Sequence, residues 1–327
     1  MAILRYIIPV LLVPFLTACY EDFNPEIDTD PVLCLNSLIT AGEPIEVRVT
    51  HTWRFNDEKS ERNHEVADAV VTVFANEKVV GPDYPAKEGD RIRIIARSPA
   101  YGTASAEVTV PYATPIGKVT VSPVVTDIWM GDKDFYHYEM FADVTFNLSI
   151  ELDVNDPAGT DNYYHFGYNW SGRDTDGSPT LSIGHFEYNS EPIFREHIGL
   201  FETVMENDDT DFVFFSDRQF AGRTYTLHLK FSHNSFNVKS RYYDDALLEC
   251  GVNLYLTTVS QSYYNWAVYK WNADEGIIGD LSDIGLAESK RGYSNVSTGA
   301  GVVAAKAAVK YTLSLKDFLQ KTLSCSE

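Results

Sequence analysis

The sequence has few cysteines and few cations. Its 327 residues include four cysteines, and 26 lysines and arginines stand against 47 aspartates and glutamates, which gives a formal net charge of −21. Surfaces that bind nucleic acids are rich in Lys and Arg, because these side chains neutralise phosphates. The charge balance therefore argues against a nucleic-acid partner.

The sequence also lacks the short motifs of common catalytic and metal centres. It contains no HExxH, GxSxG, EF-hand or GxxxxGK[ST] pattern. The remaining metal candidates are His185, Glu187 and His197, and the acidic stretches 174–176 and 207–211. Scattered histidines and loop carboxylates are more often solvated surface residues than ligands. We therefore expect no metal, no cofactor and no enzymatic activity.

The amino terminus lacks an apolar run long enough to span a bilayer. The apolar stretch 6–15 follows the single charge of Arg5, and it is shorter than the roughly 20 residues that a spanning helix needs. A short charged region, a short apolar core and small residues before a cleavage point are typical of a secretory signal. We predict that residues 1–18 are a signal peptide.

Leu16-Thr17-Ala18-Cys19 resembles the lipobox of bacterial lipoproteins, in which the cysteine is acylated and becomes the new amino terminus. The alternative is an ordinary export signal with Cys19 as a bystander. Residues 19–30 form an acidic tether, which resembles the surface-export signal of Bacteroidota lipoproteins or is a mere spacer. We expect attachment to the outer-membrane bilayer through acylated Cys19, with the protein exposed at the cell surface.

Apolar and polar residues alternate along most of the chain. The alternation is unbroken over 144–154, which predicts a long strand of an antiparallel sheet with one face in water. Short strands and turns at even spacing predict a small Ig-like β-sandwich over 31–112. Prolines 111 and 115 place the boundary there, and 113–327 is expected to form a larger antiparallel β domain.

One segment has helical spacing. Ser260 is a suitable N-cap, and Gly276 is expected to end the helix. Because β sequence flanks it, we expect the helix to cover a sheet edge or a barrel mouth, and 301–315 to return to strand. The predicted fold is thus mostly β, with one covering helix. The apolar stripe of the helix comprises Tyr264, Ala267, Val268 and Trp271.

The predicted strand 163–170 carries a ladder of aromatic side chains. Tyr164, Tyr168 and Trp170 lie on one of its faces, and His165 lies on the other. Packing in the core is the usual role of such a ladder. If the strand lies near a rim, these three rings are instead candidates for binding a sugar or a peptide side chain.

The cysteines beyond Cys19 allow at most one internal disulfide. They are Cys34, Cys250 and Cys325, so at least one of the three thiols has no internal disulfide partner. Two alternatives are open: a Cys250–Cys325 disulfide that ties the carboxyl terminus to an inner strand, or three reduced, buried thiols.

Several stretches resemble the motifs of the DUF4249 family of Bacteroidota lipoproteins. Residues 155–168 are similar to its DPxGxxNYY motif, 215–229 to its DxxFxGxxY motif, and 291–307 to its YSN-containing glycine motif. Residues 260–271 fit its helix, and 66–111 are more loosely similar to its amino-terminal module. The similarity covers nearly the whole chain after the signal peptide.

The resemblance implies a surface or periplasmic lipoprotein, often encoded beside TonB-dependent outer-membrane receptors, with no settled activity. We expect a non-enzymatic accessory or ligand-binding partner of such a receptor. The alternatives are a surface hydrolase that uses paired carboxylates on a glycan or peptide, and a structural or adhesion subunit of the envelope.

The motifs also have a direct physical interpretation. The DPAG stretch 156–159 predicts a turn, because Pro fixes φ and Gly accepts a positive φ. Asn295 is expected to bond to neighbouring backbone groups, and Gly299 and Gly301 to permit a bend or bulge before the last strand. This structural role is favoured over a ligand-binding loop.

Overall fold

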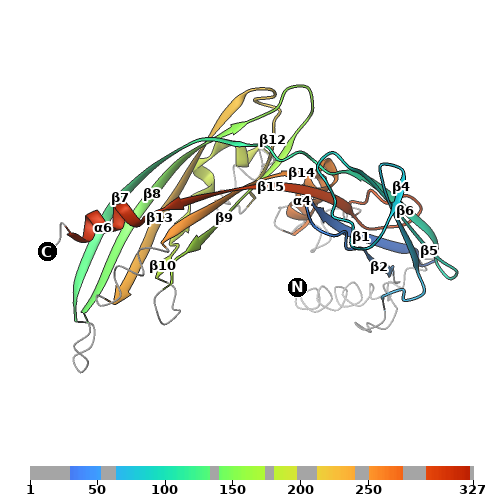
Figure 1. Ribbon diagram of the computed structural model, residues 1–327, viewed down its shortest axis with the longest axis horizontal. Coiled ribbons are helices and arrows are strands. Elements are labelled where there is room, and N and C mark those ends of the chain that lie inside the picture. Colours follow the sequence, from blue (N-terminus) through green and yellow to red (C-terminus); the bar gives the residue numbers. More distant parts are fainter. Residues whose placement is uncertain are drawn as a thin grey trace, which may run out of the picture. The chain divides into compact units, whose positions relative to one another are not determined.

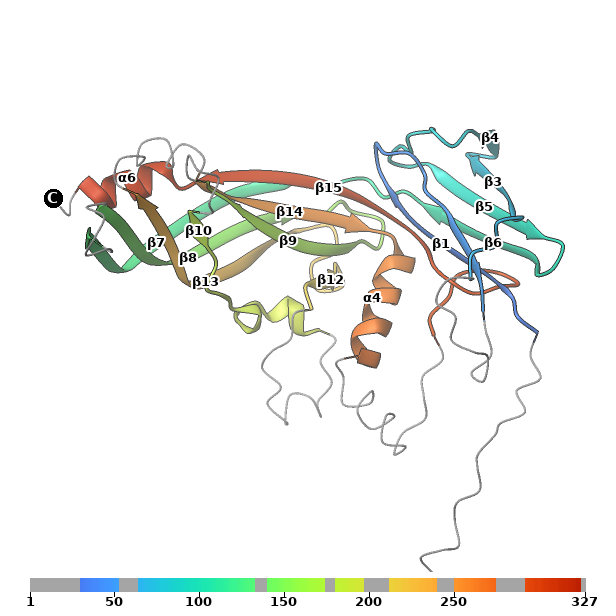
Figure 2. The ribbon, with the colours of Figure 1, turned by 90° about the horizontal axis from the view of Figure 1, so that it is seen from below.

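The computed structural model describes residues 30–52, 64–132, 140–173, 180–196, 212–239, 250–274 and 292–324. The chain divides into two compact units, of which the smaller, residues 1–31 and 53–60, lies almost wholly outside the described residues. The larger unit comprises residues 32–52 and 61–327. The prediction of a mostly β fold is confirmed (Figures 1 and 2).

The smallest sheet lies in the amino-terminal part of the chain. Four antiparallel strands are ordered β4-β3-β5-β6. Along β5, Ile92, Ile94 and Ala96 are fully buried, whereas Arg91 and Arg97 on the other face are exposed and Arg93 is half-buried, as the period of a strand requires. The strands are β3 (Val70–Ala75), β4 (Lys78–Val80), β5 (Arg91–Ser98) and β6 (Gly102–Thr109).

A second sheet joins both ends of the chain. Its six strands are ordered β12-β9-β14-β15-β1-β2, and β1 pairs with β15 in parallel, in the register Ser37–Val303. All its other pairs are antiparallel. The strands are β1 (Leu33–Thr40), β2 (Arg48–His51), β9 (Tyr163–Ser171), β12 (Phe214–Ser216), β14 (Gly251–Val259) and β15 (Val303–Ser314).

The third sheet contains the longest strands. It is ordered β10-β13-β8-β7, and β11 also pairs with β13. In β8 the residues from Val144 to Val154 alternate as predicted, and every apolar one is at most 1% exposed. The strands are β7 (Ile116–Asp132), β8 (Met140–Asn155), β10 (Leu181–Ser182), β11 (His185–Phe186) and β13 (Thr224–Lys239).

Two hydrophobic cores result. The first lies between the four-stranded sheet and β1, and it also includes Val303 and Ala305 from β15. The second lies between β8 and β13 on one side and β9 and β14 on the other. The described strands therefore form a β-sandwich-like fold, in which β15 contributes to both cores. The boundary predicted at 112/113 stays a prediction.

Two α-helices occur among the described residues. The predicted helix is α4 (Gln261–Asp274), which packs on β9, β12 and β15, so the expectation of one covering helix is met (Figure 2). Helix α6 (Lys316–Ser324) was not predicted, and it buries Leu319 and Leu323 in the second core. Short 3₁₀ turns span Tyr188–Ser190 and Pro192–Arg195. No helix in these ranges is long and apolar enough to cross a membrane.

Candidate functional site

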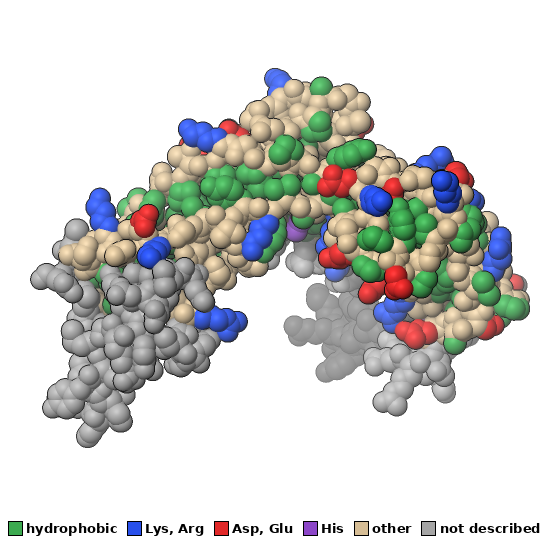
Figure 3. Space-filling view, viewed as in Figure 1, with side chains coloured by type: hydrophobic (Ala, Val, Ile, Leu, Met, Phe, Trp, Pro, Cys, Tyr) green, Lys and Arg blue, Asp and Glu red, His purple; other side chains and the backbone are tan. Residues whose placement is uncertain are grey.

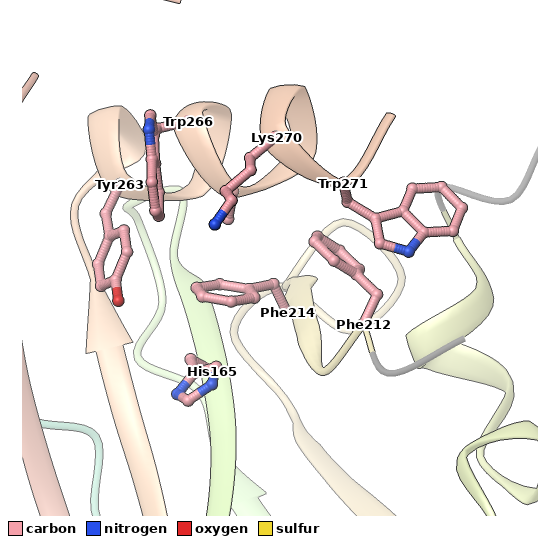
Figure 4. Close-up of a pocket in the computed structure, with 8 residues that line it drawn as sticks. His165, Phe212, Phe214, Tyr263, Trp266, Lys270 and Trp271 are labelled. Atoms are coloured by element: carbon pink, nitrogen blue, oxygen red, sulfur yellow. The ribbon is translucent and has the colours of Figure 1, made fainter. Parts of the chain in front are cut away.

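A groove of about 350 Å³ lies where α4 covers β9 and the residues that lead into β12 (Figure 4). Its volume is within the range of small-molecule sites, roughly 300–1,000 Å³. We call it the aromatic groove, because six of its eight lining residues carry aromatic rings. The lining comprises His165, Phe212, Phe214, Tyr263, Trp266, Ala267, Lys270 and Trp271.

The rings of the groove form one continuous series. Phe212 lies 5.6 Å from Trp271 and 5.4 Å from Phe214, measured between ring centroids. Tyr263 continues the series, 5.5 Å from Phe214 and 5.9 Å from Trp266. Each side chain is held by the next, so the groove keeps its shape without a ligand.

The amino end of α4 is fixed to β15. Ser260 Oγ accepts hydrogen bonds from the backbone N–H of Tyr263 at 3.3 Å and of Ala305 at 3.0 Å. The first is the predicted N-cap bond, and the second holds the cap against the sheet. Ser262 Oγ adds a 2.9 Å bond to the carbonyl of Val303. The expected stop at Gly276 lies outside the described residues.

The middle of α4 is fixed to β12. The Tyr264 hydroxyl donates to Glu196 Oε1 at 2.8 Å, and the same oxygen accepts the Ser216 N–H at 2.7 Å. Burial, and then the bond to Glu196, raise the pKa of Tyr264. This buried face orients the opposite side of the helix, which carries Trp266 and Lys270, toward the groove (Figure 4).

His165 supplies a neutral imidazole to the groove. Its ring lies 4.4 Å from that of Phe214, on the face of β9 opposite the core. Burial, and then the charge of Lys306, lower the pKa of His165 to about 4. At neutral pH the ring is therefore uncharged, with one nitrogen that donates and one that accepts a hydrogen bond.

Lys270 is the cation of the groove. Its amino group points from α4 toward Phe214 and lies 5.7 Å from the centroid of Trp266 (Figure 4). Arg91 and Arg93 of the four-stranded sheet, by contrast, are paired with acids: Arg93 lies 3.3 Å from Glu77 and Arg91 lies 3.8 Å from it. Figure 3 shows basic and acidic side chains interspersed there. No described carboxylate lies within 4 Å of the Lys270 amino group.

A second hollow of about 230 Å³ shares a wall with the aromatic groove. Tyr263 and Trp266 line both, so each ring separates two cavities. The second hollow lies over β1 and the start of β15, where Leu38 is 45% exposed.

The three aromatic residues singled out by sequence lie on the core side of β9. Tyr164 is fully buried, and its ring packs on Phe215 and Phe220. Tyr168 and Trp170 are half-buried and pack against the same core. Core packing, the usual role of such a ladder, describes these positions. Ligand binding by these three residues stays a prediction.

Of the predicted lipid and disulfide sites, the structure describes only Cys250. Cys19 and Cys325 lie outside the described residues, as does His197. Cys250 is buried, with Sγ 3.7 Å from Thr180 Oγ1. The Cys250–Cys325 pairing therefore stays a prediction. The described residues contain no group of three or more His, Cys, Asp or Glu side chains that could hold a metal ion.

Two of the sequence motifs meet in space. The Gly222 N–H donates to Asp156 Oδ2 at 2.7 Å, and the Asn162 N–H donates to Asp217 Oδ2 at 2.8 Å. The Tyr164 hydroxyl makes a further hydrogen bond with Asp156. The turn after β8 and the turn after β12 are thus tied together by two carboxylates. Burial, followed by the charge of Asp156, raises the pKa of Asp217.

The same geometry bears on the hydrolase alternative. Asp156 is 7% exposed and Asp217 is 3% exposed, so both carboxylates are almost completely removed from solvent. Both accept hydrogen bonds from the fold itself. Paired carboxylates that act as general acid and base must reach the substrate, which this pair does not. Gly159 belongs to the turn that was predicted at 156–159. Its φ is +94°, the positive value that the glycine was expected to accept.

The third motif contributes Val296, Val303 and Ala305 to the first core. Asn295 Oδ1 accepts the Val303 N–H at 2.9 Å, and its Nδ2 donates to the Val303 carbonyl at 2.8 Å. Gly301 has φ of +105°, and a Cβ there would clash with Leu35. The expected structural role of Asn295 and Gly301 matches these contacts.

Sequence reasoning missed the groove itself. Phe212, Phe214, Tyr263, Trp266 and Lys270 were not singled out. A signal was present on the helix, since Tyr263, Trp266 and Lys270 form a second stripe with two aromatic rings beside the buried one at 264 and 267. A helix with aromatic residues on two faces either buries both or exposes one for binding.

The comparisons with known proteins gave one result. The chain matches the family described as "Domain of unknown function (DUF4249)" over residues 20–312. No curated protein and no solved structure matched the chain. The match covers most of the chain and includes the motifs that form the paired turns and the Asn295 loop, so the chain belongs to the DUF4249 family.

Proposed function

We propose that this protein is a non-enzymatic binding component of the cell envelope, which captures a ligand in the aromatic groove. The observation that carries the proposal is the groove itself. It joins a series of aromatic rings, a neutral imidazole and an amino group that has no described acidic partner. Such a site offers area and orientation to a ligand.

The buried carboxylates support binding over hydrolysis. Glu191 is fully buried and accepts the Tyr225 hydroxyl at 2.6 Å and the His228 N–H at 2.6 Å. Asp156, Asp217 and Glu196 are likewise engaged by the fold. Among the described residues, the acids that are removed from water are those that hold strands and turns together.

The tether and the receptor belong to the same proposal. The lipobox-like sequence before Cys19 supports an acylated anchor in the outer membrane, with the acidic stretch to residue 30 as a leash at the cell surface. Confinement beside a TonB-dependent receptor raises the effective concentration of captured ligand without strong intrinsic affinity. This partnership rests on the resemblance of the chain to Bacteroidota lipoproteins.

The groove is tested with glycan and peptide arrays. We expect Trp266→Ala to abolish binding of the ligands that the unchanged protein captures, because it removes the ring shared by both hollows. The matched control is Trp129→Ala, which removes a 43% exposed tryptophan on β7. Ligands bound equally well by Trp266→Ala, or chemically altered after incubation, would contradict the proposal.

The anchor is tested in cells. We expect labelled palmitate to enter the protein, and Cys19→Ser to release the protein from the membrane fraction. Protease treatment of intact cells is expected to cleave the anchored protein, and complete protection would place it in the periplasm. Gentle extraction that recovers no receptor would count against the partnership.

A further inference from the structure

A row of polar side chains crosses the sheet on the same face as the aromatic groove. Asn169, Asn253 and Thr312 are register neighbours on β9, β14 and β15. Asn253 Nδ2 donates to Asn169 Oδ1 at 2.8 Å, and Thr312 Oγ1 donates to Asn253 Oδ1 at 2.8 Å. We call these three residues the polar row. Their mutual hydrogen bonds fix the orientation of both amides.

The polar row leaves donors that point away from it. Asn169 Nδ2 donates to the Tyr255 hydroxyl oxygen at 3.1 Å, so the hydroxyl proton of Tyr255 is left to donate elsewhere. The second N–H of Asn169, which is exposed, makes no hydrogen bond with a described residue. Donors held in place before a ligand arrives lose little entropy on binding.

The polar row continues the aromatic groove. His165, Gly167 and Asn169 alternate along β9 and share one face, so the groove and the row are ~13 Å apart along the strand. Gly167 lies between them without a side chain. A Cβ at Gly167 would make only ordinary contacts, 3.7 Å from His165 and 3.9 Å from Tyr255. Backbone packing therefore does not require glycine at position 167. The glycine leaves the stretch of β9 between His165 and Asn169 without a side chain, and we call this stretch the path.

Two lysines lie beside the aromatic groove and the polar row, although the protein as a whole is acidic. Lys310 lies 5.9 Å from the ring centroid of Tyr255, and Lys270 stands over the groove. Neither makes an ion pair with a described residue, although the whole chain carries a net charge of −21. Unpaired lysines beside aromatic rings and fixed donors are complementary to a negatively charged, hydroxylated ligand.

We infer that the ligand is an oligosaccharide with carboxylate groups, whose sugar rings lie on the aromatic groove and continue past Gly167 to the polar row. This inference rests on the proposed function. Aromatic rings pack against the apolar faces of sugars, the row and His165 bond hydroxyls, and Lys270 and Lys310 pair with uronate carboxylates.

Two other polymers fit less well. A nucleic acid would bring a dense series of phosphates to a chain of net charge −21, and only a few lysines lie along this path. A peptide that adds a strand needs a free sheet edge, whereas Asn169 and Asn253 lie on the face of paired strands.

Calorimetry with matched probes tests the inference. The probes are oligomers of galacturonate, mannuronate and glucuronate, each compared with its methyl ester, which keeps the sugar and removes the charge. We expect an acidic oligomer to bind about tenfold or more tightly than its ester. Lys270→Met and Lys310→Met should each remove about tenfold for the acid and little for the ester. The control is Lys78→Met on β4 of the four-stranded sheet.

A second variant tests the path. Gly167→Val places a branched side chain between the groove and the polar row, at a position where a Cβ fits without a clash. We expect it to weaken binding of long uronate oligomers and to spare disaccharides, which occupy the groove alone.

The outcomes separate the inference from the proposed function. Equal affinity for acid and ester, or no uronate binding while array ligands still depend on Trp266, would overturn the inference and leave the groove as a binding site. Array ligands that are all insensitive to Trp266→Ala would overturn the proposed function as well.

Discussion

At the scale of single residues, the buried carboxylates act as acceptors for the backbone. Asp156 is 7% exposed and satisfies donors from three separate places, namely Asn162, Tyr164 and Gly222. Removing this acceptor leaves the buried Tyr164 hydroxyl and the Gly222 N–H without their partner, whereas Asn162 Nδ2 keeps its 3.0 Å bond to the Thr160 carbonyl. A buried donor left without an acceptor costs more than the net value of one hydrogen bond.

Asp156→Ala should therefore destabilise the protein by about 2 kcal/mol or more, because the Tyr164 hydroxyl and the Gly222 N–H lose their acceptor. The measurement is the free energy of unfolding in urea. Asp161→Ala, an exposed carboxylate of the same turn, is the control and should change stability by less than about 0.5 kcal/mol. Equal effects of the two variants would show that the paired turns do not depend on Asp156.

His165 gives the stability a defined pH dependence. Its pKa of about 4 in the folded state is below the usual 6.5. Between these two pH values the unfolded chain therefore binds a proton at this residue and the folded chain does not. The stabilisation is complete above pH 6.5 and is lost as the pH falls toward 4. Between pH 7.5 and pH 5, His165→Gln should lose about 2 kcal/mol less stability than the unchanged protein.

The control for this effect is His185→Gln, at an exposed histidine on β11. Parallel profiles for the unchanged protein and His165→Gln would show that the ring is protonated as easily in the folded state as in the unfolded one.

β9 shows what residue patterns predict and what they leave open. The alternation correctly placed Tyr164 and His165 on opposite faces, because the period of a strand is two. It did not indicate which face would be open. That depends on β8 and β13 covering the Tyr164 side, and on α4 covering only part of the His165 side. Coverage is a property of distant segments and leaves no local signal.

At the scale of elements, the connection before β15 is specified by backbone geometry. Gly301 adopts φ of +105° beside the Leu35 backbone, so an alanine there meets both an unfavourable φ and a clash. We expect Gly301→Ala to lower the unfolding free energy by about 3 kcal/mol, measured in urea.

Two other glycines separate the effect of the positive φ on stability from the effect of the close approach to Leu35. Gly42 has φ of +86° with nothing within 4 Å of a Cβ, so Gly42→Ala reports the φ penalty alone, about 1 kcal/mol. Gly81 has open space and no positive φ, so Gly81→Ala should be near neutral. If Gly301→Ala matches Gly42→Ala, the close approach to β1 contributes nothing.

Two elements were hard to predict from sequence: β15 was predicted only weakly, and α6 was not predicted. Alanine has a low β propensity, which weakened the prediction of a strand at β15. In the structure, Ala304, Ala305 and Ala307 are at most 3% exposed. Small residues suit a strand that has α4 on one side and a core on the other. Leu319 and Leu323 of α6, together with Leu315 just before it, do show helical spacing, but a helix of nine residues is stable only through the core that it covers.

At the scale of the whole molecule, the parallel pair β1–β15 joins segments at opposite ends of the chain. The first core contains Leu33 and Leu35 from β1 together with Val296, Val303 and Ala305. No periodicity predicts a partner more than 250 residues away. The pairing is therefore the part of the fold that sequence reasoning could least reach.

Residues 31–112 expressed alone should not fold stably, because they lack β15 and the Val303 and Ala305 side chains that complete their core. The measurement is the dispersion of amide signals in an NMR spectrum. A well-dispersed spectrum would show that the predicted amino-terminal sandwich is an independent domain. The full chain, measured in parallel, should give one cooperative unfolding transition.

The position of β15 also sets the order of events during synthesis. Strand β1 is made early, yet its parallel partner begins at Val303, more than 250 residues later. The amino-terminal core therefore cannot close until the whole intervening segment has been made. For a protein exported as we propose, late closure keeps the polypeptide loose enough to be translocated, and the fold is completed only on the far side of the membrane.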